Sequence, residues 1–165
     1  RWFWAWEDEK EEQWLREMAQ EGWHLIKPEV FGRYTFEQGE FQDIVYRLDY
    51  NAGTKDKAEY YQLFDDAGWE FVDEMGGWQY FRKENTDGDT LEIFTDNESK
   101  AKKYSRVLIY LTIFLPIFII FMTNLSQSGV PWVQAVSVIF GVLMFLYAYA
   151  MVRLLIRIGQ VKRKL

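Results

Sequence analysis

The chain has 165 residues, a net charge of −6 and no cysteine. Without cysteine it has no disulfides, thiol nucleophiles or thiolate metal sites. Residues 1–99 contain all 25 acidic residues and 10 basic ones, a net charge of −15, whereas residues 100–165 contain 9 basic residues and no acid. The acidic N-terminal part is not expected to bind nucleic acid, because affinity for a phosphate backbone comes from Lys and Arg.

The first predicted elements are a strand and a helix. Residues 2–6 alternate Trp with Phe and Ala, and this period of two predicts a short strand with a tryptophan-rich face. Asp8 is the predicted N-cap of the helix that follows, with Glu11 three residues later as in a capping box. Gly22 is the residue expected to end that helix.

Three strands are predicted next, and then the same order of elements begins again. The strands are expected at residues 23–26, 30–36 and 44–50, with a hairpin turn at 38–39. Asp56 is the predicted N-cap of a second helix, which Gly68 ends. Further strands are expected at 69–72, 78–83 and 91–95, the last two joined by a turn at 87–89.

The recurrence has a constant spacing. Gly22-Trp23 and Gly68-Trp69 lie 46 residues apart, and at the same offset Tyr34 matches Tyr80. We therefore expect a duplicated unit, with pseudo-repeats at about 7–50 and 55–96. The predicted fold of residues 1–96 is α+β: a duplicated helix-plus-antiparallel-sheet domain, ferredoxin-like and two-layer, in which each helix covers one face of a shared sheet.

Two long uncharged stretches follow this domain. Residues 107–123 and 132–153 are predicted as transmembrane helices, because a bilayer core needs roughly 20 apolar residues of helix. Residues 124–131 form the polar loop that completes a two-helix transmembrane hairpin. A buried hairpin of a soluble protein is disfavoured, because helices of soluble proteins keep a polar stripe. For the basic residues 97–106 two alternatives remain, a linker or an extension of the first helix.

The charges beside the two spans predict their orientation. Basic residues near span ends stay in the cytoplasm. Both termini, including a basic tail at 154–165, are therefore expected to be cytoplasmic, and the chain is predicted to be a two-pass protein of the cell membrane. The residues expected to contact anionic lipid are Lys100, Lys102, Lys103, Arg106, Arg153, Arg157, Lys162, Arg163 and Lys164.

Small residues in the second span suggest contact with another helix. Ser137 and Gly141 lie four residues apart and would form a face suited to close helix packing. This pattern predicts a homo-oligomer or a membrane-protein partner.

Few residues have the spacing that catalysis or metal binding requires. His24 is the only histidine, and no other strong ligands are spaced to complete a metal site with it. A structural or surface role is therefore expected for it. No catalytic residue, metal or cofactor is predicted, and the protein is not expected to be an enzyme.

Tryptophan is unusually frequent, with 8 residues in the chain. Most of them are expected in the core of a small domain, because large rings fill a thin interior. The alternative is an exposed aromatic groove that binds a partner or an apolar ligand. The candidate residues for partner or ligand binding are Trp2, Trp4, Trp6, Trp23, Trp69 and Trp78.

Several short motifs resemble a bacterial family of membrane proteins, the domain of unknown function 2812 (DUF2812). They are the aromatic and acidic opening at 2–12, Gly22-Trp23-His24-Leu25, Tyr34-Thr35-Phe36, Tyr46-Arg47-Leu48-Asp49-Tyr50 and Ala67-Gly68-Trp69-Glu70. Members of that family are often encoded beside PadR-type regulators. The resemblance implies the domain layout, a bacterial membrane setting and, by association, a link to regulation or envelope stress, but no catalytic residues.

These observations lead to two hypotheses about function. The first is a membrane-anchored, non-enzymatic binding or regulatory module, whose acidic, aromatic-rich cytoplasmic domain recognises a protein or an amphipathic ligand. The alternative is an oligomeric membrane immunity, stress or transport-accessory factor that acts through its transmembrane hairpins.

Overall fold

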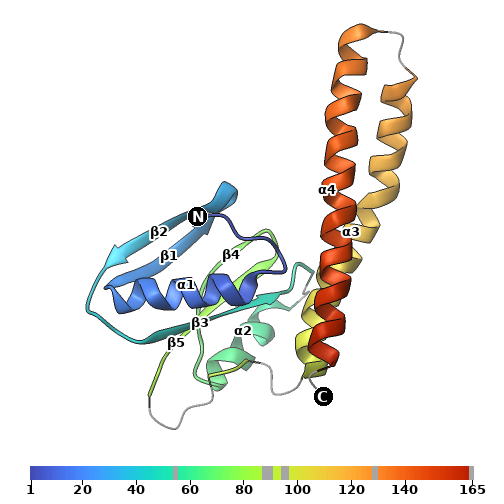
Figure 1. The fold of residues 1–165 in the computed structure, drawn as a ribbon. Helices are drawn as coiled ribbons and strands as arrows, with labels where there is room; N and C mark the ends of the chain where they lie inside the picture. Colours follow the sequence, from blue (N-terminus) through green and yellow to red (C-terminus); the bar gives the residue numbers. More distant parts are fainter. Residues whose placement is uncertain (54–55, 87–90, 94–96, 128–129, 164–165) are drawn as a thin grey trace. The chain divides into compact units, whose positions relative to one another are not determined.

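A computed structural model describes the whole chain except residues 54–55, 87–90, 94–96, 128–129 and 164–165. The chain forms two compact units, Arg1–Ser99 and Lys100–Leu165 (Figure 1). The first unit is α+β, as predicted, and the second consists mainly of two long helices.

Antiparallel strands and two helices build the first unit. The elements are α1 (Asp8–Gln20), β1 (Trp23–Glu29), a 3₁₀ turn (Val30–Gly32), β2 (Arg33–Gln38), β3 (Ile44–Tyr50), α2 (Lys57–Asp66), β4 (Glu70–Met75) and β5 (Trp78–Glu84). Strands β1 and β2 pair with each other, and the remaining strands form a sheet in the order β3-β5-β4. β1 runs beside β4, but the described residues form two hydrogen-bonded sheets rather than the predicted shared one.

The core is divided between the two faces of the β3-β5-β4 sheet. Leu15 of α1 packs with Tyr46 and Tyr80 on one face. Phe64 of α2 packs with Phe81 on the other. Successive residues of a strand point to opposite faces, so Tyr80 packs on the α1 side of the sheet and Phe81 packs on the α2 side. Helices α1 and α2 thus lie on opposite faces of this sheet, and the duplicated, two-layer, ferredoxin-like detail of the prediction is not confirmed.

The two helix–hairpin segments share local features at the predicted offset. Gly22 and Gly68 end α1 and α2 with φ angles of +83° and +79°. Each segment also has a register shift in its first strand, between Leu25 and Lys27 in β1 and at the equivalent place in β4. These parallels support a duplication, which stays a prediction.

The second hairpin is one residue shorter than the first. Glu29 pairs with Arg33 across the first loop, whereas Met75 pairs with Trp78 across the second. Gly76 and Gly77 form that two-residue loop with φ of +60° and +90°, as a type I′ turn requires. The helices correspond at an offset of 46 residues, but β2 and β5 correspond at an offset one residue smaller. Tyr34 and Tyr80, which match at 46, therefore do not occupy equivalent positions in the two hairpins.

The predicted N-terminal strand is absent. Residues 1–4 have no regular secondary structure, and a turn follows in which the backbone N–H of Glu7 donates to the Trp4 carbonyl (2.7 Å). Without a neighbouring strand, the segment bonds through this turn, through the Trp4 N–H to the Glu7 carboxylate and through Arg1 to the Gly32 carbonyl. Glu7 rather than Asp8 is the N-cap residue of α1, and it makes no side-chain capping bond. Asp56 caps α2 as predicted, since its carboxylate accepts the backbone N–H of Glu59 (3.0 Å).

Three other strand and turn predictions differ from the structure. Residues 30–32 form a 3₁₀ turn instead of the start of a strand. Residues 38–39 do not make a hairpin, because β2 pairs with β1 and not with β3. Residues 91–93 are not in a strand, while the rest of that predicted strand and the turn at 87–89 lie outside the described residues.

The second unit is an antiparallel helical hairpin. Helix α3 is Asn97–Ser126 and helix α4 is Pro131–Lys162. Residues 97–106 are therefore helical, the helix continues three residues beyond 123, and most of the predicted tail at 154–165 belongs to α4. Both helices are long and apolar enough to cross a membrane.

A repeat of seven residues forms the contact between α3 and α4. Phe140 and Tyr147 of α4 and Tyr104, Leu111 and Phe118 of α3 take part in contacts between the helices, and the same spacing continues along α4 to the buried residues Leu154 and Val161. The Phe118 ring lies 5.5 Å from that of Phe140, and the Tyr147 hydroxyl donates to the Leu111 carbonyl. A heptad spacing of this kind lets two helices keep one face together along their length.

Candidate functional site

An aromatic pocket of about 120 Å³ lies where the N-terminal segment meets the β-hairpins. Trp2, Trp4 and Phe31 line it together with Trp78 from the start of β5. Deeper lining residues include Glu11 of α1, Tyr34 of β2 and Tyr80 of β5. We call this cavity the aromatic pocket. It lies wholly within the first unit.

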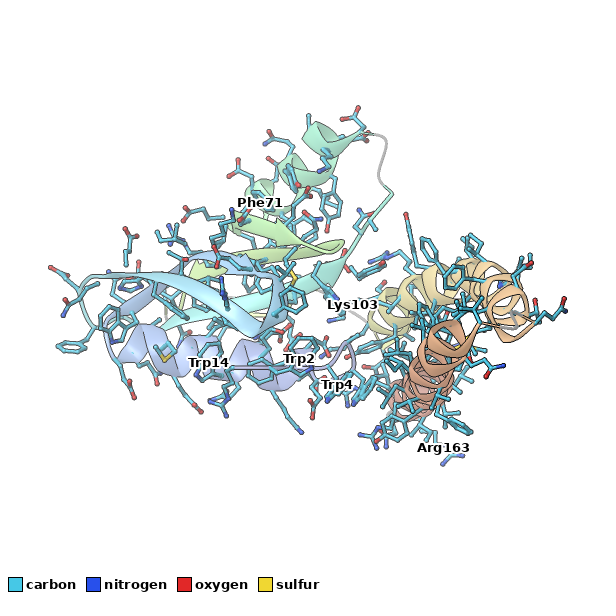
Figure 2. All side chains as sticks on the ribbon, turned by 90° about the horizontal axis from the view of Figure 1, so that it is seen from above. Trp2, Trp4, Trp14, Phe71, Lys103 and Arg163 are labelled. Carbon is cyan, nitrogen blue, oxygen red and sulfur yellow. The ribbon has the colours of Figure 1, made fainter. Side chains whose placement is uncertain are left out.

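Contacts between rings hold the N-terminal wall in place. The Trp4 and Trp6 rings stack at 5.3 Å with an interplanar angle of 3°, and Trp2 meets Trp4 edge-on at 5.8 Å. The backbone N–H of Trp4 donates to the Glu7 carboxylate at 3.3 Å. Trp2 and Trp4 are nevertheless 56% and 45% exposed, so these indoles are available to a ligand. Figure 2 shows Trp2 and Trp4 in succession on the N-terminal segment.

A glycine allows the N-terminal segment to approach the first hairpin closely. The backbone nitrogen of Arg1 donates to the Gly32 carbonyl at 2.7 Å. A Cβ atom at Gly32 would lie 2.5 Å from the Arg1 carbonyl oxygen, and the φ of Gly32 is +69°. Residue 32 must therefore lack a side chain for this wall to form.

A carboxylate shared by two tyrosines lies at the buried end of the pocket. Glu11 Oε1 accepts the Tyr80 hydroxyl at 2.7 Å and the Tyr34 hydroxyl at 2.9 Å. Burial raises the pKa of Glu11, although the two hydrogen bonds oppose that change. Burial and the adjacent Glu11 charge also raise the pKa of both tyrosines, which keeps their hydroxyls protonated. The ionised Glu11 is therefore a poorly solvated negative charge below an aromatic opening.

The structure brings three of the six predicted tryptophans to this pocket: Trp2, Trp4 and Trp78. Trp6 stacks on Trp4 but does not line the cavity. Trp23 is exposed at the start of β1, away from the pocket lining. Trp69 is only 3% exposed and packs in the core beside Phe64, so its side chain is not open to a partner.

Sequence reasoning missed Glu11, Phe31, Tyr34 and Tyr80 as pocket residues. Glu11 was assigned to a helix cap, yet the residue is buried inside α1 and bonded to residues from two strands. One signal in the sequence could have identified Glu11. It precedes Trp14 and Leu15 by three and four positions, so it lies on the same helical face as these apolar residues, and that face is expected to be buried. Its tyrosine partners could not be identified without the tertiary contacts.

The basic residues predicted to contact lipid have different environments in the second unit. Lys102, Arg153, Lys162 and Arg163 are exposed, whereas Lys100 and Arg106 are partly exposed. Lys103 is 1% exposed. The Arg157 guanidinium donates to the Tyr104 hydroxyl at 3.3 Å, within the hairpin. Lys164 lies outside the described residues.

The small-residue face of α4 is open within this chain. A Cβ atom at Gly141 would have no neighbour within 4 Å. The Ser137 hydroxyl donates to the Gln134 carbonyl of its own helix at 2.7 Å. The α3–α4 contact therefore leaves this face uncovered.

Among the residues that the structure describes, no group of three or more His, Asp or Glu side chains could hold a metal ion. His24 is buried in β1, with its ring nitrogen Nε2 2.8 Å from the Glu40 carbonyl. A part-buried ion pair, Arg16 with Asp43 at 2.6 Å, joins α1 to the residue before β3 and lowers the pKa of Asp43. That pair explains local structure and does not indicate a reaction.

Comparison with protein families identifies the chain. Residues 7–116, about two thirds of the sequence, match the family described as "Protein of unknown function (DUF2812)". The chain belongs to the DUF2812 family. The DUF2812 match covers α1, both sheets, α2 and the first part of α3, so it extends past the α+β unit into a helix that could cross a membrane. No significant match was found among curated proteins or among solved structures.

Proposed function

We propose that this DUF2812 protein is a membrane-anchored, non-enzymatic binding module that recognises an amphipathic cation in its aromatic pocket. The observation that carries the proposal is the combination of half-exposed indoles with the buried carboxylate of Glu11 in one cavity. An aromatic ring attracts a cation placed over its face, and quaternary ammonium groups are recognised by clusters of such rings. Glu11 supplies a negative charge that a neutral apolar ligand would not use.

The size of the pocket supports a headgroup rather than a whole drug-sized ligand. Beside the roughly 300–1,000 Å³ of pockets for drug-sized ligands, its volume is small, about 120 Å³. A methylated ammonium is of this order, and the apolar part of an amphipathic molecule would remain over Trp2 and Trp4. The Arg1 guanidinium already lies 5.4 Å from the Phe3 ring and 5.5 Å from the Trp14 ring, so this segment attracts positive charge.

The second unit supports placement in a membrane. Only 6% of the most apolar window of each long helix is buried, and the helices carry many exposed isoleucine, leucine, valine and phenylalanine side chains. An exposed apolar surface of that extent needs lipid or a partner. With basic residues at the open end of the hairpin, both termini are proposed to be cytoplasmic and the basic side chains to contact anionic lipid. A regulatory role linked to envelope stress and a PadR-type regulator is part of the proposal.

Binding of choline to the full chain in lipid nanodiscs tests the ligand class. Choline carries a trimethylammonium group, and 3,3-dimethylbutan-1-ol is its neutral counterpart of the same shape. Calorimetry should detect choline binding and little or no binding of the neutral alcohol. Trp2→Leu and Trp78→Leu should each weaken choline binding by about 2- to 30-fold, the range of a cation–π contact.

Trp23→Leu is the matched control, because Trp23 is exposed but does not line the pocket. Its affinity for choline should equal that of the unaltered chain. Equal binding of choline and the neutral alcohol, or no binding of either, would rule out a cation site. An equal loss in Trp23→Leu would mean that the pocket is not where choline binds.

A second candidate function, an assembly that acts through its hairpins, is favoured by the open face at Gly141. Close contact between membrane helices uses small residues of this kind. Gly141→Leu should reduce self-association measured by photobleaching of single nanodiscs or native membranes. Ile139→Leu, on another face of the helix and 61% exposed, should leave it unchanged. A monomeric unaltered chain would exclude this candidate.

A further inference from the structure

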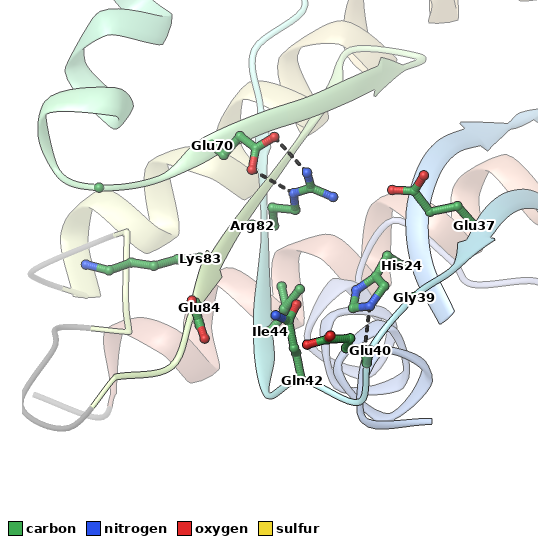
Figure 3. A pocket seen from close by; sticks show the side chains of 11 residues that line it. His24, Glu37, Gly39, Glu40, Gln42, Ile44, Glu70, Arg82, Lys83 and Glu84 are labelled. Atoms are coloured by element: carbon green, nitrogen blue, oxygen red, sulfur yellow. Dashed lines mark hydrogen bonds and ion pairs between the residues drawn. The ribbon is translucent and has the colours of Figure 1, made fainter. Parts of the chain in front are cut away.

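A second and larger cavity lies in the first unit, away from the aromatic pocket. Its volume is about 430 Å³, within the range of sites for small molecules. His24 and Glu37 from the β1–β2 hairpin line one side, and Glu70 and Arg82 from β4 and β5 line the other. Figure 3 shows these side chains facing the space between the two sheets. We call this cavity the histidine pocket.

One nitrogen of the histidine ring has no hydrogen-bond partner. His24 is only 7% exposed, and its Nε2 lies 2.8 Å from the Glu40 carbonyl oxygen. A carbonyl can only accept, so Nε2 carries the hydrogen, and in the neutral ring Nδ1 is an acceptor. Nδ1 is one of two buried side-chain polar atoms without a partner among the described residues. A buried acceptor of this kind is costly unless a donor meets it.

Neighbouring glycine backbone fixes the ring in this orientation. A Cβ atom at Gly39 would lie 2.7 Å from His24 Cδ2, so the ring occupies the space that any other residue would fill. The backbone N–H of Gly39 also donates to the Gly22 carbonyl at 2.9 Å. The ring therefore has little freedom to turn Nδ1 towards another partner. A ligand that reaches Nδ1 finds it already oriented.

The charges around the histidine pocket favour a cation. Arg82 is engaged by Glu70 in two hydrogen bonds of 2.8 and 2.7 Å, so that the two charges offset each other. The exposed carboxylates of Glu37, Glu40 and Glu84 also line the cavity. Lys83, the other basic residue of the lining, donates to the Ala67 carbonyl at 3.2 Å. Acceptors and negative charge therefore exceed donors along the lining of the histidine pocket.

From this arrangement we infer that the histidine pocket binds a small aliphatic amine with primary ammonium groups, of the polyamine class. One N–H of an ammonium donates to His24 Nδ1, and the remaining N–H groups and the charge are met by the carboxylates. A second ammonium of a diamine reaches the carboxylates on the other side, since Glu37 and Glu84 come from different sheets. A quaternary ammonium has no N–H for Nδ1, and an anion would be repelled.

The single histidine of the chain provides a direct test. The full chain, with ¹⁵N-labelled histidine and an affinity tag that lacks histidine, is placed in nanodiscs, and the imidazole nitrogens are followed by NMR. Addition of 1,4-diaminobutane should shift the Nδ1 signal in a saturable way. Tetramethylammonium and butane-1,4-diol should leave it unmoved, because the first lacks N–H donors and the second lacks charge.

Variants separate the acceptor from the surrounding charge. In His24→Gln the side-chain amide can still donate to the Glu40 carbonyl, but the acceptor at Nδ1 is lost. Diamine affinity, measured by calorimetry, should fall about tenfold or more, as expected for a hydrogen bond from a charged donor. The double variant Glu37→Gln/Glu84→Gln, at two exposed positions, tests the charge without altering a buried residue and should also weaken binding.

Three results would overturn the inference: an Nδ1 signal unmoved by the diamine, unchanged affinity in both variants, or a response only to a lysine-containing peptide. The last would assign the site to a protein partner instead. Choline affinity should be unchanged in the double variant. The inference does not depend on the aromatic pocket, so either site can fail without the other.

Discussion

The segment α1–β1–β2 and the segment α2–β4–β5 follow the same local plan, yet their helices bury different chemistry. Helix α1 buries Asp8, Glu11 and Glu12, whereas Phe64 is the only buried residue of α2. Glu11 and Glu12 are tied to strands, Glu12 by accepting the backbone N–H of Leu48 at 2.9 Å. A shared local plan therefore sets where the helices end and where the strands bend, while the buried acidic side chains belong to the first segment.

The largest expected difference in the free energy of unfolding is between variants of two adjacent residues of β5, one on the α1 side of the sheet and one on the α2 side. Phe81 is fully buried and stacks on Phe64 with ring centres 4.0 Å apart. Phe81→Ala should lower the free energy of unfolding by about 3–5 kcal/mol. Tyr80→Phe, on the α1 side, removes only the hydrogen bond to Glu11 and should cost about 1–3 kcal/mol. Chemical denaturation of both variants measures the two effects, and a larger loss in Tyr80→Phe than in Phe81→Ala would contradict the expected order.

The two glycines that end the helices offer a matched pair. Alanine at either position must adopt a positive φ, at a cost of about 1 kcal/mol or more. A Cβ at Gly22 would also lie 3.0 Å from the Gly39 carbonyl oxygen, whereas a Cβ at Gly68 would meet only the flexible end of Lys83 at 3.3 Å. Gly22→Ala should therefore destabilise more than Gly68→Ala in thermal unfolding. The reverse order would mean that the turn after α1 can yield more easily than its contacts indicate.

The two helix starts differ in capping. The carboxylate of Asp56 caps α2, but Glu7 makes no side-chain capping bond to α1. Asp56→Ala should cost about 1 kcal/mol. Glu7→Ala should cost less in capping, although it also removes the exposed pair with Lys10. Denaturation midpoints of the two variants check this order, and a larger effect at Glu7 would show that the turn before α1 matters more than the cap of α2.

The smallest expected effect is a pH-dependent one at Glu11. Burial raises the pKa of Glu11 above its usual 4.5, so the folded protein binds this proton more tightly than the unfolded chain does. Its contribution to stability is thus present below the unfolded pKa and is lost as the pH rises through the folded pKa. Glu11→Gln keeps an acceptor for the tyrosines and avoids that loss.

The variant should therefore be the more stable protein at neutral pH, and its advantage should vanish towards pH 4. Melting temperatures of both proteins between pH 4 and 7 test the sign. A constant difference across this range would mean that Glu11 titrates normally in the folded state. Choline binding should weaken in the variant at neutral pH, because the negative charge is gone.

Local signals predicted the parts of the fold that local interactions determine. The ends of both helices follow from Gly22 and Gly68, and β3 follows from its apolar residues at 44–50. The strand predicted at residues 2–6 is wrong, because a strand also needs a neighbouring strand to bond with, and alternation in the sequence does not show whether one is present. The sequence also could not assign α1 and α2 to opposite faces, since that depends on which side chains of β3 and β5 meet each helix.

The candidate sites were less predictable than the fold. Aromatic alternation pointed to Trp2 and Trp4, which do line a pocket, but Trp69 shares the same composition signal and lies in the core. The importance of Glu11 comes from hydroxyls 23 and 69 positions away in the chain. His24 lies in the motif Gly22-Trp23-His24-Leu25, but that motif indicates no binding role, and only the three-dimensional surroundings of the ring reveal the acceptor that lacks a partner.

The contact residues of α3 and α4 recur every seven positions, and this repeat would allow the hairpin to be shortened or lengthened in steps. Removing one set of seven residues from each helix would shorten it by about 10 Å while the same kinds of positions continue to oppose each other. Contact specificity and hydrophobic thickness can thus be altered separately. Matched deletions of this kind could fit the hairpin to bilayers of different thickness without redesigning how its two arms recognise each other.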